Sequence, residues 1–188
     1  VKFKDCAFYR IRGQLSTTYV QTLSFSGCFF RGETGNDAFI DCAGLYDVSF
    51  TDHCVIESIG SLVKSVSAST GMQGLRITNC LLQGLTQSIV YGSGASGFVM
   101  SGCHLESNAT PDLDFSANSL ASKSITVTGN YLFNPNGVSI KHGTADRVFS
   151  AGNAVFPSML HTEADGVTEL ISVGDDCAGG ISDATLFS

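Results

Sequence analysis

Two pairs of carboxylic acids in this sequence have the residue types and spacing needed for acid–base chemistry. Glu57 and Glu106 occupy the same place in two copies of a repeated segment, and Asp175 and Asp176 are adjacent within VGDDCAGG. Two carboxyl groups together can cleave a glycosidic bond, because one protonates the leaving oxygen while the other activates water. Which pair does so depends on how the chain positions it.

A segment of nine residues recurs along the chain and determines where Glu57 and Glu106 lie. Each copy has Cys or Asn at one position, preceded by Gly, Asn, Asp or His, and successive copies are 22 to 27 residues apart. Apolar and polar residues alternate before that position, which predicts a strand, a tight bend and a second short strand. The equivalent residues are Cys6, Cys28, Cys54, Cys80, Cys103, Asn130 and Asn153, and the copy that contains Cys54 has one extra residue, His53.

Each repeat also contains one further strand-like run, so a coil consists of three short strands and no helix. Parallel strands in an ordinary sheet need long crossovers, which this chain lacks. Strands that pair with their equivalents one coil on meet that constraint, so the repeat predicts an all-β solenoid of about seven coils. The additional runs are 16–21, 38–42, 62–67, 88–93, 113–117 and 138–142.

The repeated unit, apolar-x-apolar-[Ser/Thr]-[Gly/Asn/Asp]-[Cys/Asn]-x-apolar, resembles the right-handed parallel β-helix family. This pectate-lyase-like fold also forms the shafts of phage tailspikes, and the resemblance covers roughly residues 1–156. Stacked asparagines form a ladder at the bend in that family; Asn130 and Asn153 match it, and cysteines replace the others. We expect a parallel β-helix over 1–156 and a non-repeat, acidic C-terminal coil or capping segment over 157–188. The fold hosts lyases, hydrolases, epimerases and inert shafts, so it does not assign a function.

Composition excludes several classes of protein. A net charge of −7 without a basic run argues against binding of nucleic-acid phosphates, and no apolar run approaches the length of a membrane span. Seven cysteines without CxxC or Cys/His spacing argue against a disulfide framework and a zinc site. They indicate reduced, buried thiols in a protein folded in cytosol. We predict no cofactor and no metal, and because Val1 lies inside a repeat we expect an excerpt of a longer solenoid.

Stacked coils would align the residues that end each second short strand. In-register stacking puts Glu57 and Glu106 two coils apart, roughly 9 to 10 Å at the backbone. Inverting glycosidases separate their carboxyl groups by about 6.5 to 9.5 Å, so these two are catalytic candidates, with Arg31, Tyr9 and Gln83 as substrate-binding candidates. A solvated strand end is the alternative interpretation. The full column is Tyr9, Arg31, Glu57, Gln83, Glu106, Phe133 and Phe156.

The tetrapeptide Gly-Asp-Asp-Cys at 174–177 resembles the motif of polygalacturonases, inverting hydrolases built on the same fold. The resemblance implies that Asp175 is the general acid and that Asp176 helps to activate water. The Asn-Thr-Asp, Gly-His-Gly and Arg-Ile-Lys segments of that family do not accompany the motif. Two other interpretations of this region, a Ca²⁺ site or a plain acidic surface, involve Glu163, Asp165, Glu169, Asp175 and Asp176.

The tailspike resemblance implies a homotrimeric virion protein, folded in the host cytoplasm, that binds host cell-surface polysaccharide and in one version hydrolyses it. Tyr9, Tyr91 and Tyr131 would then line a groove. One alternative is a purely structural β-helical shaft or adhesin segment. Another is an extracellular bacterial polysaccharide hydrolase of the polygalacturonase type. A lyase is less favoured, because it needs a cation to stabilise an enolate-like charge and Arg31 is the one cation beside a candidate acid.

Overall fold

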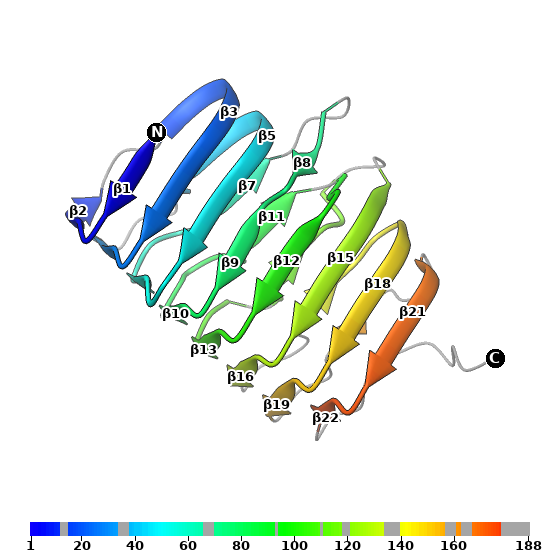
Figure 1. Cartoon of the computed structure of the whole chain (residues 1–188). Helices are drawn as coiled ribbons and strands as arrows, with labels where there is room; N and C mark the ends of the chain where they lie inside the picture. Colours follow the sequence, from blue (N-terminus) through cyan, green and yellow to red (C-terminus); the bar gives the residue numbers. More distant parts are fainter. Residues whose placement is uncertain are drawn as a thin grey trace.

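The computed structural model describes residues 1–11, 15–33, 38–65, 70–92, 94–109, 111–117, 121–133, 140–156, 161–162 and 167–177. Within these residues the regular elements are all β-strands, and no helix long and apolar enough to cross a membrane occurs among them. The strands pair in parallel with their equivalents in neighbouring coils and form two extended sheets (Figure 1). The repeat in the sequence therefore predicts the observed architecture, a parallel β-helix.

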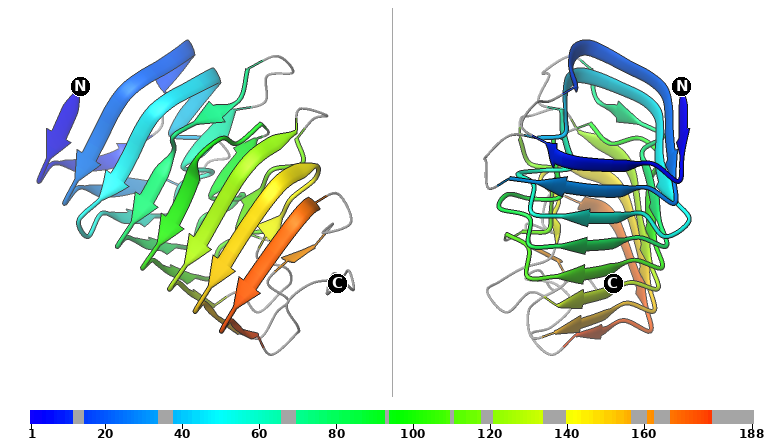
Figure 2. Two further views of the ribbon diagram at one scale, coloured as in Figure 1. Left: turned by 45° about the vertical axis from the view of Figure 1, so that its right-hand side comes forward. Right: turned by 90° about the vertical axis from the view of Figure 1, so that its left-hand side faces the viewer.

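An eight-stranded sheet forms the side of the solenoid that follows the bend. Its strands pair in parallel and in sequence order, so equivalent residues of successive coils lie next to each other. Figure 2 shows these strands stacked along the axis. They are β2 (Ala7–Ile11), β4 (Phe29–Gly32), β6 (Val55–Glu57), β10 (Leu81–Gln83), β13 (His104–Glu106), β16 (Tyr131–Phe133), β19 (Ala154–Phe156) and β22 (Asp176–Cys177).

A fourteen-stranded sheet forms the other two sides of each coil. Near the N-terminus one long strand, β5 (Ile40–Thr51), covers both sides. Its start pairs with β7 (Val63–Ser65), and its later part pairs with β8 (Met72–Gln73) and β9 (Arg76–Thr78). The long strands curve over the edge of the solenoid in Figure 1. The side that precedes the bend contains β1 (Lys2–Lys4), β3 (Leu15–Ser26), β8 (Met72–Gln73), β9 (Arg76–Thr78), β12 (Phe98–Ser101), β15 (Ser122–Thr128), β18 (Ala145–Ala151) and β21 (Val167–Val173). The remaining side contains β7 (Val63–Ser65), β11 (Val90–Gly92), β14 (Leu113–Asp114), β17 (Ile140–Lys141) and β20 (His161–Thr162).

A residue in the left-handed backbone conformation turns the chain from one sheet into the other. Gly102 and Gly129 have φ angles of 64° and 62° at this position, and Asn79 has 54°. Gly, Asn and Asp adopt this conformation at the lowest cost, which explains why they precede the Cys or Asn of the repeat. The extra His53 is also accommodated here, because Asp52 and His53 both have positive φ while the flanking strands keep their register.

Inward-facing side chains fill the solenoid in columns that change from aromatic to aliphatic. Phe25 lies between Phe3 and Phe50, with ring centroids 5.1 and 5.0 Å away and nearly parallel planes. The next coils place Ile77 and Met100 at the equivalent position, both fully buried. Burying one such side chain contributes about 1.5–3 kcal/mol, and a stacked ring pair adds about 0.5–1.5 kcal/mol. Repeated apolar burial therefore stabilises every coil.

The solenoid extends past residue 156, where we expected a non-repeat segment over 157–188. β21 pairs with β18 through Ala151 and Val173, and β22 pairs with β19 through Val155 and Cys177. Gly174, with a φ of 65°, turns the chain between β21 and β22. Residues 167–177 are therefore one more copy of the repeat. This copy was not recognised in the sequence because apolar and polar residues do not alternate clearly in it: Ile171 and Val173 face outward but are apolar.

Candidate functional site

One outward-facing residue from each of the first seven strands of the eight-stranded sheet belongs to one straight column, as predicted. Arg31 pairs in register with Tyr9 and Glu57, and Gln83 lies between Glu57 and Glu106. The preceding residue is buried in the strands from β4 to β19, and in β2 it is the partly buried Phe8, so these side chains face outward. The outer column comprises Tyr9, Arg31, Glu57, Gln83, Glu106, Phe133 and Phe156.

The centre of the outer column contains two carboxylates that are separated by one strand. Two strand spacings put the backbones of Glu57 and Glu106 about 9.6 Å apart. The Arg31 Nε lies 3.7 Å from a Glu57 oxygen, and the Glu57 side chain is only 19% exposed. Glu106 is half exposed, and one of its oxygens lies 3.7 Å from the His104 Nε2. The Gln83 amide between them adds both a hydrogen-bond donor and an acceptor.

Aromatic side chains flank this polar centre on both sides. Tyr9 is 67% exposed and contacts the Phe29 ring at 5.3 Å. At the other end Tyr131 lies 4.9 Å from the imidazole of His104. The rings of Phe133 and Phe156 are nearly parallel, at 9°, with centroids 6.1 Å apart. The face is therefore aromatic, then polar, then aromatic along the solenoid axis.

A series of open hollows follows the same face. The largest, of about 690 Å³, is lined by Tyr9, Arg10, Arg31, Gly32, Glu33 and Ser58. Ser58 also lines a hollow of about 210 Å³ with Gln83 and Glu106. Glu106 in turn borders another of about 210 Å³, with His104, Tyr131 and Phe133. Neighbouring hollows share Ser58 or Glu106 in their linings, so they follow one another as a shallow groove beside the outer column.

The structure brings together most, but not all, of the predicted site. Glu57, Glu106, Arg31, Tyr9 and Gln83 share one face, as the in-register repeat predicts. Tyr91 does not join Tyr9 and Tyr131, because it belongs to β11 in the other sheet.

Two further residues of the face, His104 and Ser58, were not predicted from the sequence. His104 faces outward beside Tyr131, two positions before the outer column, and strand alternation alone could have identified it. Ser58 lies in the turn after β6, at a φ of 55°. No alternation pattern applies in a turn, so Ser58 could not be predicted from the sequence.

Asp175 occupies the ladder position of the last described coil rather than a catalytic site. Its carboxylate accepts hydrogen bonds from the backbone N–H and the side-chain amide of Asn153, both at 2.8 Å. The hydroxyls of Ser150 and Ser172 donate to its other oxygen. Asp176, the next residue, is exposed. The two carboxylates therefore do not converge on a common point.

The hydrogen bonds to Asp175 also set its protonation. Burial alone would raise the pKa of this carboxyl, but the donors from Ser150, Ser172 and Asn153 together lower it below the ordinary value. A general acid needs the opposite shift, toward a proton retained near neutral pH. This environment corrects the polygalacturonase-like assignment of Asp175, and Asp176 loses its proposed partner with it.

The acidic residues of the C-terminal region do not gather into a cation site among those described. Glu169, near the start of β21, pairs with Arg147 of β18, whereas Asp175 follows the other end of the same strand. Within the described part of the chain, no three His, Cys, Asp or Glu side chains are arranged to hold a metal. Glu163 and Asp165 lie outside the described residues.

The ladder inside the bend changes from thiols to amides along the chain. The thiols of Cys54, Cys80 and Cys103 lie 3.4 to 3.6 Å from the carbonyls of Phe25, Phe50 and Ile77 in the preceding coil. Each thiol also lies 3.1 to 3.5 Å from a carbonyl of its own coil, so its single proton has two acceptors within reach. The Nδ2 atoms of later members bond the equivalent carbonyls: Asn130 that of Met100 at 3.2 Å, and Asn153 that of Val127 at 2.9 Å. The ladder comprises Cys6, Cys28, Cys54, Cys80, Cys103, Asn130, Asn153 and Asp175.

The ladder thiols do not have the environment of reactive cysteines. Burial raises the pKa of the Cys28 thiol. Hydrogen bonding along the row Cys54, Cys80 and Cys103 raises the pKa of the central thiol and lowers the pKa of its two neighbours, but all three side chains are buried. A nucleophilic cysteine needs an accessible thiolate in an electropositive setting. Six cysteines are unpaired: Cys6 is half-buried, and the buried ones are Cys28, Cys42, Cys54, Cys80 and Cys103. Their positions fit the predicted structural role.

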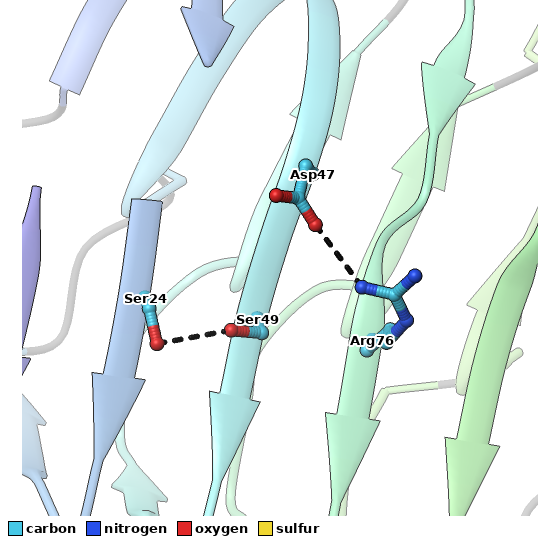
Figure 3. Close-up of polar contacts among 4 residues, drawn as sticks. All are labelled: Ser24, Asp47, Ser49 and Arg76. Carbon is cyan, nitrogen blue, oxygen red and sulfur yellow. Dashed lines mark hydrogen bonds and ion pairs between the residues drawn. The ribbon is translucent and has the colours of Figure 1, made fainter. Parts of the chain in front are cut away.

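The side of the fourteen-stranded sheet that precedes the bend presents polar side chains that bond to one another (Figure 3). The Ser49 hydroxyl donates to the Ser24 hydroxyl at 3.1 Å. Arg76 Nη1 donates to Asp47 Oδ1 at 3.0 Å, and both side chains are more than half exposed. Because these groups already satisfy each other across neighbouring strands, this surface provides matched controls for the outer column.

Comparisons with known proteins leave the chain without an assigned family. No family model, no curated protein and no solved structure matches it. The fold is established by the structure itself, whereas membership of the pectate-lyase-like or tailspike families stays a prediction from the repeat. The function has to be inferred from the residues of the outer column.

Proposed function

We propose that the outer column binds a polysaccharide that lies along the solenoid axis, across the strands of the eight-stranded sheet. The observation that carries the proposal is the aromatic–polar–aromatic order of residues along one shallow groove. Six strand spacings separate Tyr9 from Phe156, about 29 Å. An extended polymer with a short chemical repeat is the class of ligand that uses such a face.

The side chains match the two kinds of surface that a sugar presents. The faces of a pyranose ring carry C–H groups, which pack on exposed rings such as Tyr131 and Phe156. Its hydroxyls both donate and accept, so they bond carboxylates such as Glu57, the Gln83 amide and the Arg31 guanidinium. Rings at the ends and hydrogen-bonding groups in the centre would hold successive sugars of one chain.

Binding of immobilised and soluble oligosaccharides to the full chain tests the proposal. The variant Tyr131→Ala removes one of the exposed rings of the site and should weaken binding at least tenfold. Tyr19→Ala removes another exposed tyrosine, 47% accessible, from the fourteen-stranded sheet and should leave binding unchanged. Equal loss in both variants, or no glycan bound by the wild type, contradicts the proposal.

Hydrolysis of the bound glycan is a second candidate function, favoured by the placement of Glu57 and Glu106 on either side of Gln83. Their backbone separation of about 9.6 Å lies near the upper end of the inverting range. Hydrolysis would be supported if the wild type releases reducing ends and if both Glu57→Gln and Glu106→Gln abolish this release without abolishing binding. Undiminished release in either variant contradicts the assignment, and release by neither wild type nor variants leaves a binding face alone.

The tailspike assignment, with its homotrimer and its place in the virion, is part of the same proposal and rests on the solenoid repeat. A passive shaft or adhesin segment is the competing function. Sedimentation equilibrium of the full chain separates a trimer from a monomer. Glycan binding by the outer column separates a receptor-binding segment from a shaft.

A further inference from the structure

The charged side chains of the binding face are largely paired with each other. Arg10 lies 3.4 Å from a Glu33 oxygen, and Arg31 lies 3.7 Å from a Glu57 oxygen. Both pairs border the largest hollow: Arg10, Arg31 and Glu33 line it. Each guanidinium therefore has a carboxylate of the protein beside it.

The remaining charges on the face are acidic. Glu106 and Asp176 are exposed on β13 and β22. The described part of this face thus has two arginines and four acids, and the chain as a whole has a net charge of −7. A surface with excess negative charge repels polyanions and slows their association.

From this charge pattern we infer that the polysaccharide is uncharged, built of neutral hexoses rather than of uronic, sialic or sulfated sugars; the inference rests on the proposed function. A carboxylate or sulfate of a ligand that binds Arg31 competes with Glu57, whose oxygen lies 3.7 Å from the guanidinium Nε. That side chain is 19% exposed, and a partly buried carboxylate that loses its partner destabilises the complex. Neutral hydroxyls avoid this cost, because they bond the pair without separating it.

The aromatic end of the groove supports the same class of ligand. Phe133 and Phe156 present two nearly parallel rings on adjacent strands. No lysine or arginine lines the neighbouring hollow, which is formed by His104, Glu106, Tyr131 and Phe133. Apolar sugar faces gain from such rings by burial of C–H surface. A chain of charged sugars would place anions near Glu106 instead.

The test compares neutral β-glucan, mannan and galactan oligosaccharides with oligogalacturonate and sulfated oligosaccharides, all titrated onto the full wild-type chain at 50 and 500 mM NaCl. We expect a neutral oligosaccharide to bind with less than a twofold change between the two salt concentrations, and the anionic ones to bind at least tenfold more weakly. The inference is overturned if anionic oligosaccharides bind as tightly as neutral ones, or more tightly, and if their affinity falls as salt is added. That result would still support the proposed binding face. No binding of any glycan overturns the inference and the proposed function together.

The variant Glu57→Gln sharpens this test, because it frees Arg31 without removing a hydrogen-bonding side chain. It should raise the affinity for oligogalacturonate at least fivefold at 50 mM NaCl, and 500 mM NaCl should remove the gain. The matched control is Asp47→Gln, which frees Arg76 from its 3.0 Å pair on the other sheet. This variant should not change the affinity for oligogalacturonate. Circular dichroism verifies that both variants are folded. A gain in neither variant, or the same gain in both, contradicts the role assigned to the Arg31–Glu57 pair.

Discussion

The inner and outer surfaces of the eight-stranded sheet differ in how far their residues repeat. On the inside, successive coils place Phe30, Ile56 and Leu82 at one position, all of them apolar and buried. On the outside, the same strands place an arginine, a glutamate and a glutamine in register. Positions that repeat hold the coils together, and positions that change from coil to coil are available for a ligand.

The largest effect should come from the amide part of the ladder. Asn130 is 2% exposed; its Oδ1 accepts from the Cys103 N–H at 2.9 Å and its Nδ2 donates to the Met100 carbonyl at 3.2 Å. Asn130→Leu leaves both backbone groups buried and unpaired, at about 1–3 kcal/mol each. We expect the free energy of unfolding in urea to fall by about 2–6 kcal/mol. Asn130→Cys, which restores the thiol of earlier coils, should lose less than half of that, and equal losses would contradict the equivalence of thiol and amide.

A smaller effect, on binding rather than stability, should follow from the outer column. Arg31→Gln removes the guanidinium beside Glu57 and should weaken glycan binding about tenfold, or about 1.4 kcal/mol. Exposed ion pairs contribute only about 0–1 kcal/mol to folding, so the urea midpoint should barely change. Arg76→Gln breaks a comparable pair with Asp47 and should alter neither quantity. Loss of binding in the Arg76 variant as well would remove the distinction between the two surfaces.

The carboxylate at the end of the ladder should make stability depend on pH. Because hydrogen bonds lower the pKa of Asp175 in the folded state, its contribution is present above the unfolded pKa of about 3.9 and is lost as pH falls through the folded value. The difference in thermal midpoint between wild type and Asp175→Asn should therefore shrink between pH 6 and pH 3. A difference that stays constant over this range would mean that the ionised carboxylate is not what Asn153 and the two serines stabilise.

The smallest effect should come from exchanging a thiol for an amide. In Cys103→Asn the new Nδ2 can donate to the Ile77 carbonyl, which lies 3.4 Å from the wild-type thiol. Its Oδ1 can accept from the coil before, as Asn130 does. We expect the free energy of unfolding of this variant, measured in urea, to lie within about 1 kcal/mol of the wild-type value. Cys103→Leu should instead destabilise the chain by overpacking. A severe loss in the asparagine variant would show that the thiol region cannot accept the amide ladder.

The fold could be predicted from the sequence because one local pattern recurs in every coil. Gly, Asn or Asp followed by Cys or Asn marks the left-handed bend, and the alternation around it determines which residues face inward. The same register predicts the outer column, down to the position of Gln83 between Glu57 and Glu106. The insertion of His53 was also recognisable, since it changes the length of the bend without changing the strands.

The role of Asp175 could not be predicted in the same way, because a short motif competed with the repeat. Gly-Asp-Asp-Cys matches a catalytic tetrapeptide, yet Asp175 also follows Asn153 at the repeat distance of 22 residues. Only the contacts with Asn153, Ser150 and Ser172 decide between the two. The shape of the groove depends likewise on turn residues such as Ser58, whose placement follows from backbone geometry that no periodicity describes.

Two adjacent residues of β16 test the division between inner and outer surfaces most directly. Tyr131 is 44% exposed and Leu132 is fully buried. Glycan affinity and stability to urea should respond separately in the variants Tyr131→Ala and Leu132→Ala. Tyr131→Ala should lose at least tenfold in affinity, with a stability change below about 1 kcal/mol. Leu132→Ala should lose about 2–5 kcal/mol of stability, and its folded molecules should keep the wild-type affinity. If both substitutions reduce affinity and stability in parallel, or if Tyr131→Ala leaves binding intact, the groove along the outer column is not the binding face.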